Sequence, residues 1–326
     1  MQQAEARLNP GPAAASIEPG ITRRKKQSLW TYLVLNKWLY IFLIPGFVYL
    51  FVFKYIPMFG IVIAFKDLSL VKGIWASEWV GFQHFQLLFE SQHFYRVLRN
   101  SLLLSVYQIL FGFPAPIILA LMLNEVRQVV FKRVTQTVLY LPHFISWVVL
   151  AGIIINFLSP STGLVNHIIK SFGYEPIPFL MKAEYFRTII VSAEIWKEVG
   201  WGTIIYLAAM TGIDPTLYES ATIDGASRIQ RIRYITIPGI STTAIILLLL
   251  NLGNILDNGF EQVFLLYNPL TYETGDVFET YTYRIGLQEG RLSYSTAVGL
   301  FKSAVGFVLI IAANYAARRI SGKSIW

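Results

Sequence analysis

The chain has 326 residues, of which 55% are hydrophobic and only 14% are charged. Soluble domains carry roughly a quarter charged residues, so this composition favours a membrane protein. The net charge of +8 matches basic residues flanking membrane spans better than nucleic-acid binding. Because the sequence has no cysteine, disulfide frameworks, thiolate metal sites and cysteine nucleophiles are excluded.

The N-terminal residues 1–28 are rich in Ala, Pro, Gln and Glu, which predicts a disordered cytoplasmic tail. The cluster Arg23-Arg24-Lys25-Lys26 makes this tail basic. Six apolar blocks follow, and each is long enough to cross a hydrocarbon core of roughly 30 Å. The sequence therefore predicts an all-α membrane domain of six transmembrane helices over 29–320, with a cytoplasmic tail at 321–326. The blocks cover residues 39–64, 98–123, 136–158, 187–210, 239–257 and 294–317.

Lysine and arginine are unevenly distributed beside these blocks. Fifteen lie on the N-terminal flank, in the second and fourth loops, and in the C-terminal tail. Eight lie in or beside the other three loops, 66–97, 159–186 and 258–293. Cytoplasmic loops of membrane proteins carry an excess of these residues. We therefore expect both termini in the cytoplasm and three substantial loops on the outer side of the membrane.

Three charged residues, Glu194, Lys197 and Glu198, interrupt the fourth block. Charges inside a membrane span are costly and usually face a bundle interior or a water-filled cavity. Lys197 and Glu198 follow Glu194 by three and four residues, a spacing that permits neutralisation within one helix. Two explanations stay open: a structural ion pair near the outer interface, or a solute pathway lined by Glu194 and Lys197.

The segment 212–238, between the fourth and fifth blocks, is a polar island. Asp214-Pro215 is a strong helix start, because aspartate caps backbone amides and proline suits the first helical position. Gly225 can bend the chain. A second short helix, 226–234, would then turn back towards the membrane, and Pro238 would mark the entry to the fifth span.

Residue spacing within this island favours contact with another protein. In a helix from Pro215, Ala221 and Gly225 share a face, and their small size would let a partner approach closely. Glu219 and Asp224 would offer carboxylate acceptors to that partner. An ordinary solvated loop, punctuated by glycine and proline, explains the same spacings equally well.

The island also resembles a known motif, the EAA loop of permease subunits in ATP-driven importers. That motif reads Glu-Ala-Ala, three residues, Gly, nine residues, Ile-x-Leu-Pro, and Glu219, Ala221, Gly225, Ile235 and Pro238 match it in register. Serine at position 220 and isoleucine at position 237 are mild departures. Stretches elsewhere in residues 40–319 resemble the oligosaccharide permeases of this family. They are Phe53–Gly60, Phe111–Pro116, Leu141–Trp147, Tyr267–Pro269 and Thr280–Gly286.

The resemblance implies a type I ABC importer permease fold in the inner membrane, with cytoplasmic N- and C-termini. It implies that the island is a coupling helix seated on a cytoplasmic ATPase. It further implies a heterodimer with a second permease, an ATPase dimer that holds ATP and magnesium, and an extracytoplasmic solute-binding protein. Lipid would surround this chain, which would itself bind no cofactor. The coupling residues would be Glu219, Ser220, Ala221, Asp224, Gly225 and Ala226.

On this resemblance the chain forms half of the pathway for an oligosaccharide. The first permease subunits of bacterial alginate importers are among the similar proteins, so a polyuronate such as alginate is one candidate substrate. An ion-coupled secondary sugar transporter is the alternative from another class, although its typical inverted repeats and broken helices are not evident. A membrane-embedded glycosyl-transferring enzyme is disfavoured, because the loops contain no clustered catalytic carboxylates.

Asn251, Asn254, Asp257 and Asn258 form a polar series along the fifth block. Helical spacing would place the three asparagines on one stripe. Sugars need such hydrogen-bonding groups, so the stripe predicts a substrate pathway lined by Asn251, Asn254 and Asn258. Hydrogen bonding between helices explains the series equally well.

Residues that could carry bond chemistry form no recognisable pattern. The histidines never fall at metal-ligand spacing, and no Gly-x-Ser-x-Gly elbow occurs. Residues 317–324 superficially resemble a phosphate-binding loop but lack its leading glycine. We therefore expect no catalytic residue, no metal ligand and no enzymatic activity in this chain.

Overall fold

The structure is a computed structural model that describes residues 35–321. Within this range the only strands are β1 (Lys66–Asp67) and β2 (Glu78–Trp79), which pair antiparallel. The predicted tail 1–28, its basic cluster and most of the predicted tail 321–326 lie outside the described residues. The chain divides into two compact units, Met1–Phe59 and Gly60–Trp326.

The described part of the first unit is a long apolar helix. It consists of α2 (Lys37–Leu50), the π-helical turn η1 (Phe51–Tyr55) and α3 (Ile56–Met58). None of these segments contains a buried residue. A helix that is apolar all round needs lipid or protein to cover it. The run Lys37–Phe65 is accordingly long and apolar enough to cross a membrane.

The second unit begins with a small ribbon and a long helix. Lys66 closes the ribbon loop by donating from Nζ to the carbonyls of Ile74 at 3.0 Å and Trp75 at 2.9 Å. The helix that follows runs over Gln92–Asn124 and contains the second predicted span. The elements are η2 (Phe59–Phe65), β1, α4 (Gly73–Ala76), β2, α5 (Gln83–Glu90), α6 (Gln92–Tyr107), η3 (Gln108–Gly112) and α7 (Pro114–Asn124).

The third predicted span is broken. Its two halves, Val129–Phe144 and Trp147–Leu158, meet at an angle of 102°, so the prediction of one continuous helix over 136–158 is wrong. Pro142 favours a helix end here, and Ser146 caps the next helix by accepting from the Val149 amide at 3.4 Å. The elements are α8 (Val129–Tyr140), η4 (Leu141–Phe144), α9 (Trp147–Leu158), α10 (Leu164–Ser171), η5 (Phe179–Met181) and α11 (Ala183–Thr211).

The fifth predicted span belongs to one helix over Arg228–Gly253. This continuity replaces the predicted separate helix 226–234, and Pro238 lies inside the run rather than at its entry. The elements are α12 (Pro215–Ile223), α13 (Arg228–Arg231), η6 (Ile232–Thr236), α14 (Ile237–Gly253), α15 (Phe260–Leu266), η7 (Pro269–Thr271), α16 (Tyr272–Gly275), α17 (Phe278–Tyr283), η8 (Arg284–Gln288) and α18 (Leu292–Ser321).

Four helices of the described chain are long and apolar enough to span a membrane, and the bent pair Val129–Phe144 and Trp147–Leu158 counts as a fifth if it forms one span. The helix α11 has 29 residues, but Glu194, Lys197 and Glu198 make it more charged than the other spans. The prediction of an all-α membrane protein is therefore confirmed. The count of six spans and the cytoplasmic termini stay predictions.

Three π-helical turns share one cause. The turns η1, η3 and η6 each end two residues before a proline, at Pro57, Pro114 and Pro238. Proline has no amide N–H, and its ring displaces the carbonyl four residues earlier. The residues ahead of it therefore adopt the wider i→i+5 turn. In η3, for example, the Phe113 amide donates to the Gln108 carbonyl at 3.1 Å.

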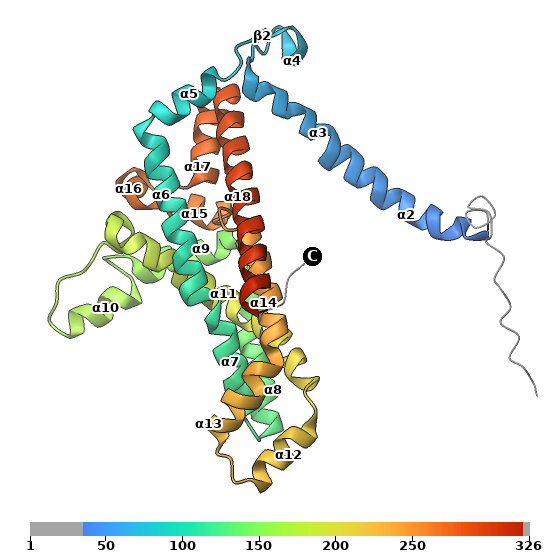
Figure 1. The fold of residues 1–326 in the computed structure, drawn as a ribbon. Coiled ribbons are helices and arrows are strands. Elements are labelled where there is room, and N and C mark those ends of the chain that lie inside the picture. Colours follow the sequence, from blue (N-terminus) through green and yellow to red (C-terminus); the bar gives the residue numbers. More distant parts are fainter. Residues whose placement is uncertain (1–34, 322–326) are drawn as a thin grey trace, which may run out of the picture. The chain divides into compact units, whose positions relative to one another are not determined.

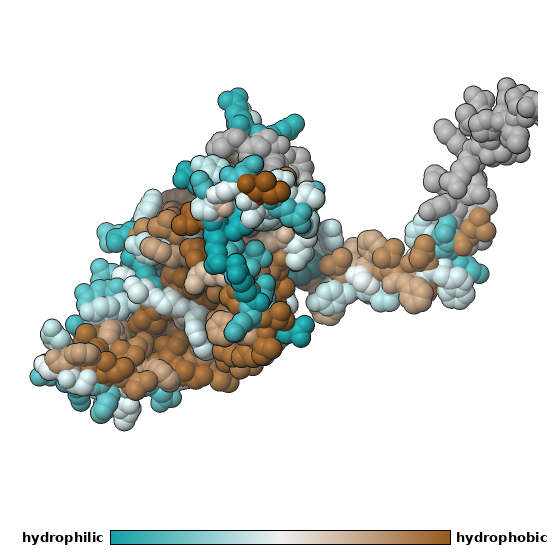
Figure 2. All heavy atoms as spheres, turned by 90° about the horizontal axis from the view of Figure 1, so that it is seen from below, coloured by the Kyte–Doolittle hydropathy of each residue, from teal (hydrophilic) through white to brown (hydrophobic). Residues whose placement is uncertain are grey.

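The helix α11 contributes buried residues to two apolar clusters of the second unit, and a further cluster forms among α5, α6, α17 and α18. A side chain at Gly200 would collide with the carbonyl of Leu139, and one at Gly202 would lie 3.0 Å from the ring of Pro116. These two glycines therefore let α8 and α7 pack closely on α11. At one end of the unit lies α12, and at the opposite end lie α5 and α17 (Figure 1). Seen from the α12 end, hydrophilic side chains stand beside a broad hydrophobic surface (Figure 2).

Candidate functional site

The predicted helix start at Asp214-Pro215 is confirmed. Asp214 is extended, and its Oδ1 accepts a hydrogen bond from the Thr216 amide at 2.9 Å. Pro215 takes the first helical turn, where a missing amide costs little. Hydrogen bonds from the backbone and side chain of Thr216 hold the pKa of the Asp214 carboxyl below its ordinary value of 3.8.

Replacing Asp214 by alanine should loosen the first turn of α12, because that turn loses its side-chain acceptor. The amide of Thr216 should then exchange about fivefold faster with solvent in a hydrogen–deuterium exchange measurement. In the unchanged protein the cap is fully present above pH 3.8 and is lost as the pH falls through the lowered folded pKa of Asp214. Asp214→Asn keeps an acceptor, so equal exchange in the two variants would contradict this explanation.

The helix α12 ends at Ile223, and Gly225 reverses the chain in the left-handed conformation with φ = +76°. The Ala226 amide donates to the Ala221 carbonyl at 2.8 Å, and the Gly225 amide donates to the Thr222 carbonyl at 3.1 Å. This pair of bonds is a Schellman motif, which satisfies the last carbonyls of a helix. Gly225 therefore bends the chain as predicted. The predicted helical face shared by Ala221 and Gly225 is wrong, because the helix has already ended.

Two side-chain hydrogen bonds fasten α12 to the helix that follows. The hydroxyl of Tyr218 lies 2.9 Å from Oγ1 of Thr236, which is buried, and Arg231 donates to Oγ1 of Thr222 at 2.6 Å. Ser227 starts α13 with a capping box completed by Gln230. The island is therefore a short helix braced against the base of the run Arg228–Gly253.

The six residues predicted to contact a partner lie together on α12 and its terminal turn. Ala221 and Ala226 are half-buried, whereas the other four are exposed. Ile223 is 86% exposed and adds an apolar side chain at the same end. Figure 1 places this helix at the tip of the second unit. The exposed residues are Glu219, Ser220, Asp224 and Gly225.

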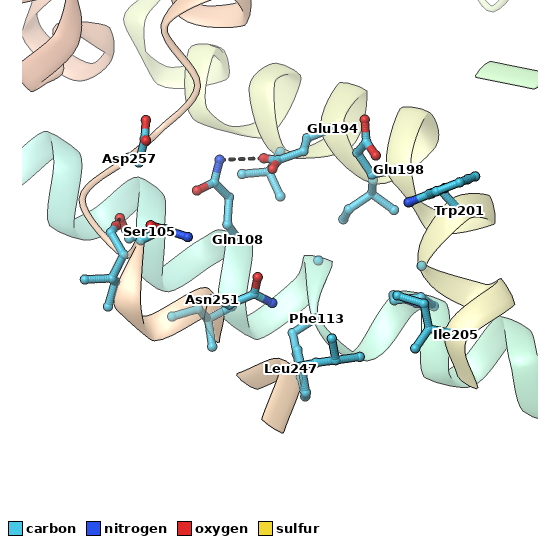
Figure 3. Close-up of a pocket in the computed structure, with 18 of the residues that line it drawn as sticks. Ser105, Gln108, Phe113, Glu194, Glu198, Trp201, Ile205, Leu247, Asn251 and Asp257 are labelled. Atoms are coloured by element: carbon cyan, nitrogen blue, oxygen red, sulfur yellow. Dashed lines mark hydrogen bonds between the residues drawn. The ribbon is translucent and has the colours of Figure 1, made fainter. Parts of the chain in front are cut away.

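A cavity of about 380 Å³ lies among α6, η3, α7, α11 and α14. Its wall includes the widened turn η3, which Pro114 causes. Gln108 of this turn donates to the carboxylate of Glu194 on α11 at 2.5 Å. Asn251 projects towards them from α14, so three helices supply polar groups to one cavity (Figure 3). The remaining wall is largely apolar, as in most small-molecule sites.

Further polar and aromatic groups complete this cavity. Asn254 and Asp257 line it from beyond the end of α14, and Glu198 and Trp201 line it from α11. The indole of Trp201 stacks on the ring of His143 with centroids 4.5 Å apart. Carboxylates, amides and an aromatic face are the groups that bind sugar hydroxyls and the apolar faces of sugar rings.

The charges of the fourth span pair differently from the sequence prediction. Lys197 lies 3.4 Å from Glu198 and donates to the carbonyl of His143 at 2.6 Å. Glu198 also accepts a hydrogen bond from Nδ1 of His143 at 2.8 Å. Lys197 is buried and does not line the cavity, and Glu194 instead binds Gln108. The structure therefore supports Glu194 as a lining residue and Lys197 as a structural one.

The predicted stripe along the fifth span is wrong in its geometry. The helix α14 ends at Gly253, so Asn254 and Asn258 are not on the helix that carries Asn251. Asn258 is fully buried and donates to the carbonyl of Ser101 at 3.3 Å and to Oγ of Ser105 at 2.9 Å. It links two segments of the bundle rather than lining the cavity.

Replacing Asn258 by leucine should lower the free energy of unfolding by about 1–3 kcal/mol, because the carbonyl of Ser101 and the hydroxyl of Ser105 lose their hydrogen-bond donor. Asn254→Leu is the matched control, because Asn254 is exposed on the cavity wall. Equilibrium unfolding in mixed micelles should separate the two variants, with Asn254→Leu close to the unchanged protein. Equal stability of both variants would contradict the structural role of Asn258.

Sequence reasoning missed Gln108 and Trp201, and it named Asp257 in the polar series without predicting that it lines the cavity. Gln108 lies in an apolar span, where a polar residue is a functional signal by itself. The dipeptides Phe113-Pro114 and Ala115-Pro116 marked the nearby irregular turn. Within the described residues, no group of three or more metal-ligating side chains occurs.

Known proteins resemble this chain over most of its length. The sequence profile of the family named binding-protein-dependent transport system inner membrane component matches residues 112–322. The chain belongs to this family. Two similar proteins come from Bacillus subtilis (strain 168). Protein LplB is 49% identical over 94% of this chain and 97% of its own length. The polygalacturonan/rhamnogalacturonan transport system permease protein YteP is 45% identical over 93% of this chain and 95% of its own length.

Solved structures resemble the permease as well. A chain of a bacterial ABC transporter involved in the import of the acidic polysaccharide alginate is 47% identical, with a TM-score of 0.84. The match covers 90% of the permease and 99% of that chain. A second solved structure is that of a bacterial alginate ABC transporter in complex with an alginate pentasaccharide-bound periplasmic protein. One of its chains is 46% identical, with a TM-score of 0.84, and the match covers 91% of the permease and 99% of that chain. The predicted ABC importer permease fold and multi-pass inner-membrane location are confirmed.

Proposed function

We propose that this permease forms half of the transmembrane pathway of an ATP-driven importer for an acidic oligosaccharide. The relatives named above support this substrate class, because one transports polygalacturonan and another belongs to an alginate importer. The partners are a second, different permease, a cytoplasmic ATPase dimer that holds ATP and magnesium, and a solute-binding protein. This chain supplies half of the pathway and the coupling helix α12, and it catalyses no reaction.

The observation that carries the proposal is the direct connection between α12 and the cavity. The exposed helix α12 is fastened by Tyr218 and Thr222 to the base of the run Arg228–Gly253. That run carries Asn251 into the cavity wall. A force on α12 is therefore transmitted along a single helix to the place where polar groups converge.

The energetics require that the two states of the pathway bind their partners differently. Nucleotide can shift the equilibrium between inward and outward states only through unequal affinity for them. Closure of the ATPase dimer would displace Glu219 and its neighbours on α12. The braced helix then alters the spacing of Asn251, Gln108 and Glu194, which hold sugar hydroxyls in one state and release them in the other.

Purification from the native membrane tests the assembly. In mild detergent the tagged permease should retain a second permease and an ATPase dimer, and the reconstituted complex should import trigalacturonate only with ATP and the binding protein. Uptake by the permease alone would reject the subunit role. Uptake driven by a proton or sodium gradient without ATP would favour the ion-coupled alternative.

A further inference from the structure

A second cavity, of about 400 Å³, lies far from α12. It is lined by α5, the start of α6, the segment from α16 to η8, and the start of α18. It shares no lining residue with the cavity around Glu194. Figure 1 places α5 and α17 at the end of the second unit opposite α12. If α12 faces the cytoplasm, this second cavity faces the side from which substrate arrives.

The second cavity is rich in cationic groups. His93, Arg96, Arg284 and Arg291 line it, and Glu289 is the only carboxylate among its lining residues. Arg284 is already neutralised, because it forms an ion pair with the buried carboxylate of Asp276. Its pairing leaves two guanidinium groups, those of Arg96 and Arg291, for a ligand.

These two guanidinium groups form no ion pair within the described part of the chain. Arg96 donates to Nδ1 of His93 at 2.9 Å, and its Nε is buried without a hydrogen-bond partner in the same range. The guanidinium of Arg291 lies over the ring of Tyr294, 4.8 Å from its centroid. Arginine presents donors in a planar fork that matches a carboxylate.

Aromatic rings form another part of the cavity wall. Tyr281 and Tyr294 are buried there with their hydroxyls 3.2 Å apart, whereas Tyr272 is only half-buried. The ring of Tyr272 can offer an apolar edge or face to the C–H face of a pyranose. The volume lies within the usual range of small-ligand pockets, about 300–1,000 Å³.

We propose that this cavity binds the carboxylate of a uronic acid residue, with Arg96 and Arg291 as its ligands and Tyr272 beside the sugar ring. The inference rests on the proposed function and adds a first contact for the acidic chain at the entrance. A cationic cavity also concentrates an anionic substrate there. Neutral sugars of the same size gain no such contact.

Direct binding to the assembled importer tests this inference. Purified complex in nanodiscs, without the solute-binding protein, is titrated with trigalacturonate and with its fully methyl-esterified form. The ester keeps the sugar and removes the negative charges. The unchanged complex should bind the acid at least about tenfold more tightly than the ester. Equal affinities, or no binding of the acid, would overturn the inference.

The variants locate the contact. Arg96→Gln with Arg291→Gln should weaken binding of the acid by about tenfold or more and leave the ester unchanged. Arg99→Gln is the matched control, because Arg99 lies on α6 and is exposed but does not line the cavity. Arg96→Lys should retain part of the affinity, and the melting temperature of each complex checks its folding. Unchanged acid binding in a folded double variant would overturn the inference.

Two further measurements distinguish a carboxylate site from a contact with the solute-binding protein, and the failure of this inference from the failure of the proposed function. If the double variant binds trigalacturonate normally but loses affinity for the solute-binding protein, the arginines contact that protein and the inference is overturned. ATP-driven uptake by the same preparation is a separate measurement. An importer that takes up trigalacturonate with ATP and the solute-binding protein, but whose double variant binds the acid as tightly as the unchanged complex, retains the proposed function and loses the carboxylate site.

Discussion

Replacing Gly225 by tryptophan is expected to reduce ATP-driven uptake at least about thirtyfold, a loss typical of a central interface residue. Gly225 has φ = +76°, so any side chain strains the turn, and tryptophan adds bulk at the exposed tip of α12. Nothing lies within 4 Å of a Cβ built there, so the fold itself has room. Uptake and ATP hydrolysis in proteoliposomes should therefore become uncoupled in a normally inserted protein.

Gly173→Trp is a matched control for this experiment. Gly173 also has a positive φ, +83°, and open space around a built Cβ, but it follows α10 in a predicted outer loop. The Gly173→Trp variant should retain nearly full ATP-driven uptake. Gly225→Ala separates backbone strain from bulk and should fall between the two. Comparable losses at both tryptophan sites would show that α12 has no special role. The same comparison applies to Glu219→Lys, which reverses a charge on the exposed helix.

The second large effect is expected at Asp276, which is fully buried. Its carboxylate pairs with Arg284 and accepts a hydrogen bond from Thr280 at 2.9 Å. Burial alone would lower the pKa of Arg284, but the hydrogen bond and charge of Asp276 outweigh it and hold that pKa above its ordinary value. Asp276→Ala leaves the largely buried cation of Arg284 without its partner, which should lower the free energy of unfolding by about 3 kcal/mol.

The exposed ion pair of Lys182 and Glu184 provides the control. Its charged atoms lie 3.8 Å apart, and both side chains are about half exposed or more. Glu184→Ala should change the free energy of unfolding by less than about 1 kcal/mol, because exposed pairs are screened by water. Denaturant titration of both variants in one detergent gives the comparison. Similar stabilities would mean that the Asp276–Arg284 pair contributes little.

Local signals in the sequence predicted the start of α12 correctly and its end incorrectly. Asp214-Pro215 determines a helix start through its own hydrogen bonds and ring geometry, which a sequence displays directly. At the other end, Gly225 adopted the left-handed turn four residues after Ala221, and this terminated the helical spacing assumed for those two residues. Glycine is the usual residue at the left-handed position that ends a helix, so a glycine in a polar helical pattern indicates a possible helix end.

The cavity was predictable only in part, because its residues come from separate helices. Asn251 and Glu194 stand out in the sequence as polar residues within apolar blocks, and the structure brings them to one cavity. Gln108 also stands out as a polar residue in an apolar span, but its hydrogen bond to Glu194 becomes apparent only when η3 and α11 are packed together. Asn258 shows the opposite case. It has the same side chain as Asn251, but the end of α14 at Gly253 turns it into the core.

The proline-linked π-turns set the rotational register of the spanning helices. Each such turn holds one residue more than an α-helix accommodates, and one residue corresponds to roughly 100° about the helix axis and 1.5 Å along it. In the second span the extra residue lies in η3, between α6 and α7. Because Pro114 holds this extra residue in place, the side chains of α7 are turned by that angle from where an unbroken α-helix continuing α6 would present them. The proline therefore sets which side chains of the two halves face the same cavity.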